Sequence, residues 1–137
     1  MIRILLIEDD NERVIAIRSW LPADIHLVHA GSAGRAIGIL LRDRDAYAGI
    51  LLDHDLREQI VTERDFFLSG SNVVKTIITC ISPDTPILVH SMNPGCAPNM
   101  VKSLEKAGFS VTRLPMWEMT RENFNEWLEE VRANWDY

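Results

Sequence analysis

The sequence predicts a doubly wound α/β domain, with a five-stranded parallel sheet covered by helices on both faces. Short apolar runs, rich in β-branched residues, alternate five times with segments whose apolar residues recur at helical spacing. Continuous apolar runs of this length are typical of strands covered on both faces. No internal repeat or low-complexity linker interrupts the alternation, and 137 residues is the size of one domain. We therefore expect a single domain over residues 1–137.

The first half of the chain supplies three strands and two helices. The expected strands are Ile2 to Ile7, Ile25 to Val28 and Gly49 to Leu52. A first helix follows the opening strand, closes at Pro22, and carries apolar residues at Val14, Ile17 and Leu21. Ser32 is a suitable N-cap for the second helix.

The second half begins with a long charged loop, from Leu56 to about Ser69. A helix is expected from Ser71 or Asn72, and Pro86 opens a strand over Ile87 to Val89. The next helix carries Met100, Val101 and Leu104 and stops at Gly108. The strand from Phe109 to Leu114 is less apolar, so we expect it at an edge of the sheet. Thr120 is expected to cap a final amphipathic helix.

Composition excludes several classes of function. The formal net charge of -6 argues against a DNA-binding surface, which needs clustered lysines and arginines. No apolar run is long enough to cross a membrane, and no signal peptide is expected at Met1-Ile2-Arg3. Cys80 and Cys96 form no C-x-x-C pair, so reduced thiols and a cytoplasmic location are expected.

Polar residues follow three of the expected strands. The three sequences are Glu8-Asp9-Asp10, Asp53-His54-Asp55 and His90-Ser91. In the strand order 2-1-3-4-5 these strands are neighbours, and ligands of such sheets bind beyond the carboxyl ends of the strands. Carboxylates gathered at one edge repel one another and need a proton or a hard cation. The pattern therefore predicts a site for Mg²⁺ or another divalent cation that also binds phosphate.

Each acid also has a simpler explanation. Asp9 and Asp10 are suited to capping a helix, because acids favour a helix N-terminus. Asp53 or Asp55 are suited to a turn. Each explanation is credible alone. A shared site is the stronger hypothesis, because otherwise all of these explanations would have to hold at three adjacent strand ends.

These motifs resemble those of the receiver domains of response regulators, over nearly the whole chain. The matching segments are Ile4 to Asp10, Leu51-Leu52-Asp53 and Pro86 to Ser91. The resemblance implies a flavodoxin-like, receiver-like fold. It implies that Glu8 and Asp9 are metal-side acids, that Asp53 is the phosphoacceptor, and that the backbone carbonyl of Asp55 helps bind the metal. It also implies that the Ser91 hydroxyl contacts the phosphoryl group.

The chain departs from that family at three places. Receivers have a Lys-Pro pair at the end of the fifth strand, where this sequence has Leu114-Pro115, with Arg113 one residue earlier. Val111 stands at the position of the family's aromatic switch residue. The loop after Asp53 is longer than usual. A missing lysine removes the cation that pairs with the phosphoryl oxygens.

Two histidines, His54 and His90, stand where receivers have apolar residues. Together with the segment from Ser69 to Val74, they resemble a divergent branch, the cyclic-phosphate processing receiver domains. A histidine pair can act as general base and general acid on a phosphodiester. That branch implies a nucleotide 2′,3′-cyclic phosphate as substrate, with Ser91 and Asn93 orienting the phosphate.

The alternative is that both histidines are structural. Side chains alternate along a strand, so His54 is expected to point away from Asp53 and His90 away from Ser91. With regular strands, both histidines would lie on the opposite face or edge from the carboxylates. The long loop, with Phe66 and Phe67, is expected to form either a lid over the site or a homodimer contact.

Three hypotheses of function follow. The first is a metal-assisted phosphoesterase acting on a phosphate ester or nucleotide-type ligand, with Asp53, His54 and His90 as catalytic groups. The second is a stand-alone receiver that a histidine kinase phosphorylates on Asp53 in a phosphorelay. The third is a degenerate receiver that only binds a protein partner. The predicted metal ligands are Glu8, Asp9, Asp53 and Asp55.

Overall fold

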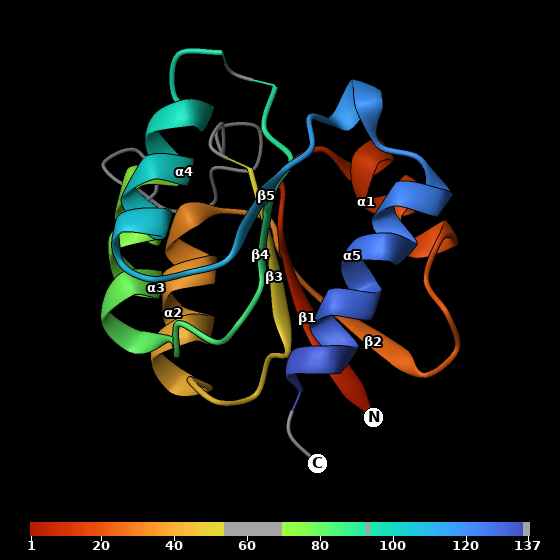
Figure 1. Cartoon of the computed structure of the whole chain (residues 1–137), viewed down its shortest axis with the longest axis horizontal. Helices are drawn as coiled ribbons and strands as arrows, with labels where there is room; N and C mark the ends of the chain where they lie inside the picture. The colour runs from red at the N-terminus through yellow and green to blue at the C-terminus, as the bar shows by residue number, and fades with distance from the viewer. Residues whose placement is uncertain (54–69, 93, 136–137) are drawn as a thin grey trace.

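The computed structural model describes residues 1–53, 70–92 and 94–135, and it has a single central sheet (Figure 1). The strands are β1 (Ile2–Ile7), β2 (Ile25–Ala30), β3 (Gly49–Leu52), β4 (Ile87–Val89) and β5 (Val111–Arg113). Their order in the sheet is β2-β1-β3-β4-β5, and every neighbouring pair is parallel. The predicted fold class and strand order are confirmed.

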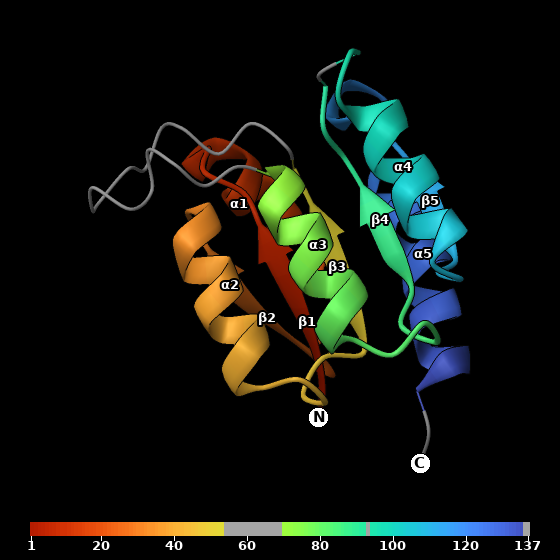
Figure 2. The same cartoon turned by 90° about the vertical axis from the view of Figure 1, so that its left-hand side faces the viewer.

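Helices cover both faces of the sheet, which makes three layers (Figures 1 and 2). On one face lie α2 (Ala33–Arg42), α3 (Gly70–Cys80) and α4 (Ala97–Lys106). On the other lie α1 (Asn11–Ser19) and α5 (Arg121–Asn134), with a short 3-10 helix, η2 (Met116–Glu118), between β5 and α5. Alternate residues of the strands therefore enter two apolar cores, one on each side of the sheet.

Several element ends differ from the sequence-based expectation. Helix α1 ends at Ser19, so Leu21 lies beyond it, as expected for residues next to Pro22. Strand β2 extends to Ala30, because β1 pairs with it in register to that point. Strand β5 is shorter than expected and spans only Val111–Arg113, but it lies at the edge of the sheet as predicted.

The predicted caps of two helices are confirmed. The Ser32 side chain accepts a hydrogen bond from the backbone N–H of Arg35 at the start of α2. At the start of α5, Thr120 and Asn123 form a capping box, in which each side chain accepts from the other's backbone N–H. Cys80 and Cys96 are half-buried thiols, and the structure has no disulfide between them. In the part of the chain that the structure describes, no helix is long and apolar enough to span a bilayer.

Gly49, the first residue of β3, packs directly against α5. A Cβ atom at this position would lie 2.8 Å from the Val131 Cγ2 atom and 2.9 Å from a ring carbon of Trp127. Gly49→Ala is therefore expected to lower the free energy of unfolding by about 1–3 kcal/mol through overpacking. Urea unfolding checks this value. Gly38→Ala is the control, because a Cβ at that position meets no atom within 4 Å.

Candidate functional site

The strand register places Glu8, Asp53 and His90 side by side. Ile7 pairs with Leu52, and Leu52 pairs with Val89. The ladder then continues one residue further, because the backbone N–H of Asp53 donates to the Ile7 carbonyl at 3.0 Å. Likewise, that of His90 donates to the Leu52 carbonyl at 3.1 Å. The three polar residues therefore form a row across three neighbouring strand ends.

This row lies on the side of the sheet covered by α1 and α5. Two residues before each member stand Leu6, Leu51 and Leu88, which belong to the apolar core on that side. Side chains two residues apart along a strand share a face. The alternative in which His90 lies on the opposite side from the carboxylates therefore does not hold. The strand does alternate, but its register with β3 aligns His90 with Asp53.

Three buried carboxylates converge at this edge. Glu8, Asp9 and Asp53 are 0%, 5% and 2% exposed. One oxygen from each lies within 4.8 Å of the others. Carboxylate oxygens in this arrangement match what Mg²⁺ prefers from a protein, and the gathered negative charge favours a divalent cation. The donor set therefore fits the cation that the sequence predicted.

Both oxygens of the Glu8 carboxylate have bonding partners. Its Oε2 atom accepts hydrogen bonds from the backbone N–H groups of Asp9 and Asp10, at 3.0 and 3.2 Å. Its Oε1 atom lies 3.0 Å from the His90 Nε2 atom and 3.4 Å from an Arg13 guanidinium nitrogen. Burial raises the pKa of Glu8 to about 7. The hydrogen bond from the Asp10 backbone and the charge of Arg13 act in the opposite direction.

The Asp53 carboxylate has one oxygen that makes no hydrogen bond in the described part of the chain. Its Oδ2 atom is buried and has no hydrogen-bond partner among the described residues. Among the described residues, Asp53 pairs with Arg13, whose guanidinium nitrogen lies 3.7 Å from this oxygen. Burial, with the charge of Glu8 as the next cause, raises the pKa of Asp53 to about 6. Asp53, the residue that the family resemblance assigns to phosphoryl chemistry, thus has a buried oxygen that can still accept a hydrogen bond or bind a cation.

His90 is completely buried, and its ring contacts the Glu8 carboxylate. Burial lowers its pKa to about 4, so the ring is neutral at neutral pH. Its Nδ1 atom is buried without a hydrogen-bond partner among the described residues. Arg113, at the end of β5, adds a positive charge that also lowers the His90 pKa. The ring therefore orients the Glu8 carboxylate and lies out of contact with solvent.

Arg13 is a site residue that the sequence analysis missed. Asp10 is the N-cap of α1, where its side chain accepts from the backbone N–H groups of Glu12 and Arg13. This cap makes Arg13 the third residue of the helix, so its side chain returns toward the acids that precede the helix. The available signal was the charge pattern: an arginine three residues after an acidic cap and five after Glu8.

The remaining predicted site residues have mixed outcomes. His54, Asp55, Asn93 and the loop carrying Phe66 and Phe67 lie outside the described residues. Ser91 is completely buried at the end of β4, and its contact with a phosphoryl group stays a prediction. His29, on β2, contacts the Glu8 backbone carbonyl, which lies 2.6 Å from its Nε2 atom.

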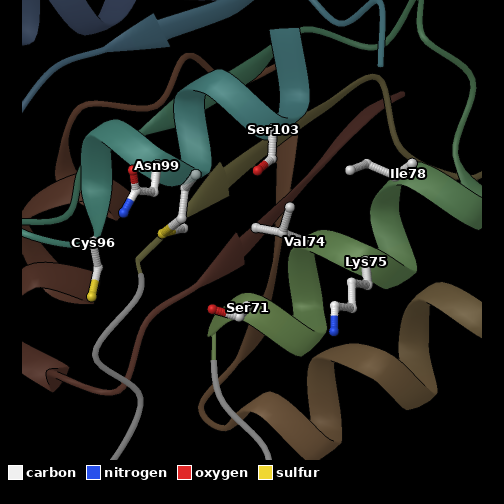
Figure 3. Close-up of a pocket in the computed structure, with 8 residues that line it drawn as sticks. Ser71, Val74, Lys75, Ile78, Cys96, Asn99 and Ser103 are labelled. Atoms are coloured by element: carbon white, nitrogen blue, oxygen red, sulfur yellow. The ribbon is translucent and has the colours of Figure 1, made fainter. Parts of the chain in front are cut away.

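A separate groove lies between α3 and α4 (Figure 3). Its volume is about 230 Å³. It is lined by Ser71, Val74, Lys75, Ile78, Cys96, Asn99, Met100 and Ser103. None of these side chains is a carboxylate or an imidazole, and none belongs to the row of Glu8, Asp53 and His90. The groove is therefore a different surface from the carboxylate site.

The chain is similar in structure to solved receiver domains. A response regulator receiver domain protein from Clostridium thermocellum superimposes with a TM-score of 0.71 at 16% identity, covering 97% of this chain and 95% of that one. The receiver domain of the Francisella response regulator 1452 gives 0.69 at 16% identity, covering 98% and 100%.

A third similar structure is the N-terminal domain of a response regulator/sensory box/GGDEF 3-domain protein from Carboxydothermus hydrogenoformans. Its TM-score is 0.67 at 16% identity, covering 96% of this chain and 94% of that one. The sequence matches no protein-family model and no curated protein. The comparisons therefore establish that the fold is that of receiver domains.

Proposed function

We propose that this chain is a receiver-type module that binds a divalent cation and accepts a phosphoryl group on Asp53. The observation that carries the proposal is the Asp53 Oδ2 atom, which is buried and without a hydrogen-bond partner among the described residues. It stands within a cluster of three carboxylates at the sheet edge where parallel α/β folds bind ligands. Similarity to solved receiver domains supports the same assignment.

Asp9 and Asp53 are the residues best placed to hold the cation directly. The Glu8 oxygens already accept from two backbone N–H groups and contact His90 and Arg13, so we expect Glu8 to act mainly through its charge. A bound Mg²⁺ would neutralise charge that develops on the phosphoryl oxygens. The backbone carbonyl of Asp55 remains part of the proposed ligand set.

The proposed reaction is a phosphoryl transfer to a carboxylate. An oxygen of ionised Asp53 attacks phosphorus, the bond from phosphorus to the leaving group of the donor breaks, and the leaving group departs with the electron pair. The product is an acyl phosphate on Asp53. The donor would be a phosphohistidine of a histidine kinase or a small acyl phosphate. In the described part of a chain that lacks the expected lysine, Arg13 pairs with Asp53, and the charge of Arg113 acts on the neighbouring His90.

Incubation with acetyl phosphate and Mg²⁺ tests this proposal. We expect the intact mass to increase by one phosphoryl group, and hydroxylamine to remove that group, as is typical of acyl phosphates. Asp53→Asn should abolish the modification, because the amide is not a nucleophile for phosphorus. Asp84→Asn, an exposed acid that is hydrogen-bonded to Ser82, is the matched control and should be modified as the wild type is. Modification that persists in Asp53→Asn would contradict the assignment.

A second candidate function is the processing of a phosphate ester such as a nucleotide 2′,3′-cyclic phosphate. One observation favours it: burial brings the pKa values of Glu8 and Asp53 to about 7 and about 6. Carboxyl groups with pKa values near neutrality suit general acid–base catalysis. The neutral, fully buried His90 suits that role less well than the sequence implied.

A panel of 2′,3′-cyclic nucleotides, incubated with the same proteins and Mg²⁺, distinguishes the two functions. Turnover lost in Asp53→Asn and retained in Asp84→Asn would establish the esterase. Neither turnover nor modification would leave the third hypothesis, a module that only binds a protein partner. We also propose a cytoplasmic location, where thiols such as those of Cys80 and Cys96 stay reduced.

A further inference from the structure

Arg13 extends from the first turn of α1 into the carboxylate site. One terminal guanidinium nitrogen lies 3.4 Å from the Glu8 Oε1 atom and 3.7 Å from the Asp53 Oδ2 atom. The Nε atom of the same side chain lies 3.6 Å from the Asp10 Oδ2 atom. A single guanidinium thus contacts two members of the carboxylate cluster and the N-cap acid beside it.

Arg13 is also the charge that balances these two carboxylates. Among the described residues, Asp53 forms its ion pair with Arg13, while Glu8 pairs with Arg13 and His90. An arginine keeps its charge throughout the accessible pH range. The guanidinium therefore acts at the Asp53 oxygen that a divalent ion would use and at the Glu8 carboxylate beside it.

We propose that Arg13 is a built-in counter-cation that competes with a divalent ion for Glu8 and Asp53, and thereby weakens the affinity of the site for that ion. The inference rests on the proposed cation site and adds its regulation. A divalent ion among these oxygens and a guanidinium a few ångströms away repel each other, so binding requires the Arg13 side chain to move away.

The Arg13 side chain has an alternative position, beside Asp10 and toward solvent. Its side chain is 25% exposed, whereas Glu8 and Asp53 are buried, so it can turn toward solvent without leaving an apolar core. Asp10 is 30% exposed and already holds the Nε atom. When an ion enters, the guanidinium can leave Glu8 and Asp53 and remain paired with Asp10. The competition is therefore between two arrangements of one side chain, with the helix unchanged.

Titration of the purified protein with Mg²⁺, and with Mn²⁺ as a spectroscopic probe, tests this inference. Arg13→Gln should bind either ion about tenfold more tightly than the wild type, because the repelling unit charge beside a partly solvated site is gone. Arg13→Lys keeps the charge and is expected to stay within about threefold of the wild type. Arg18→Gln is the matched control, since it removes one charge from an exposed position on the same helix. It should bind as the wild type does.

A second readout is stability without the ion. Cation-free Arg13→Gln should unfold at a lower temperature than Arg18→Gln, because Glu8 and Asp53 lose their counter-charge. Saturating Mg²⁺ should close that gap. Equal or weaker ion binding by Arg13→Gln, with the wild type and Arg18→Gln binding normally, would overturn the inference and leave the proposed function standing. Absence of ion binding in all of the variants would overturn both, and binding by Arg13→Gln alone would establish that Arg13 keeps the site free of cation.

Discussion

His90→Ala is expected to lower the free energy of unfolding by about 3–5 kcal/mol, a large part of the stability of an ordinary domain. The imidazole is completely buried, so its removal leaves a cavity beside β3 and β4. It also removes the Nε2 contact, 3.0 Å long, that orients the Glu8 carboxylate. Because Glu8 is itself buried, the lost partner is not replaced by bulk water. Urea unfolding of both proteins measures the difference.

His90→Gln separates orientation from acid–base chemistry. The glutamine amide nitrogen reaches about as far as Nε2 and can donate to Glu8, but it cannot exchange a proton near neutral pH. We expect this variant to recover at least half of the stability lost in His90→Ala and to keep acetyl phosphate modification of Asp53. A stable His90→Gln protein that loses turnover of a cyclic phosphate would show instead that the ring takes part in ester chemistry.

The cation-free protein is expected to lose about 3 kcal/mol of stability as the pH rises from about 4.5 to about 7. Folding raises the pKa of Glu8 from 4.5 to about 7, and that of Asp53 from 3.8 to about 6. In these windows the folded protein holds protons that the unfolded chain has released. The stability that these protons contribute is complete below the unfolded-state values and is lost as the pH passes the folded-state values.

His90 opposes this trend over part of the range. Folding lowers its pKa from 6.5 to about 4, so between these values the unfolded chain binds a proton that the folded protein excludes. Its contribution therefore rises with pH and offsets roughly one of the two carboxyl groups. The net effect is a fall in stability, which thermal unfolding in matched buffers can follow.

Two variants and one ligand check the origin of this pH dependence. Glu8→Gln and Asp53→Asn should each flatten the fall, because each removes a group that releases a proton in the window. Saturating Mg²⁺ should reverse the trend, since the ion binds the ionised carboxylates and stabilises the folded state by mass action. A steady rise in stability of the cation-free protein from about pH 4.5 to about pH 7 would contradict the pKa directions on which the prediction depends.

These expectations describe a site that opposes the stability of its own fold. Three carboxylates lie at the end of an otherwise apolar sheet, where protonation, a counter-cation or a metal ion must neutralise them. Such conflicts between local chemistry and stability are typical of functional sites. An apolar residue at position 53 would be expected to stabilise the cation-free protein and to remove the site, because the buried Oδ2 atom of Asp53 makes no hydrogen bond among the described residues.

Much of the fold follows from local patterns in the sequence. The apolar runs at residues 2–7, 49–52 and 87–89 predicted buried parallel strands, and the structure has strands over those residues. Ser32 and Thr120 predicted helix starts, because a side-chain oxygen at an N-cap bonds backbone N–H groups within the next turn. The gathering of Glu8, Asp9 and Asp53 followed from strand order alone, since parallel strands end at one edge.

Only the tertiary structure decided how the site is assembled. Alternation along one strand assigns side chains to two faces, but the position of His90 beside Glu8 depends on the register between strands separated by more than thirty residues of chain. The contact of Arg13 with Asp53 depends in the same way on where α1 packs on the sheet. Local spacing determines periodicity and caps. The register of distant strands, and the charges that meet across them, are set by packing of the whole domain.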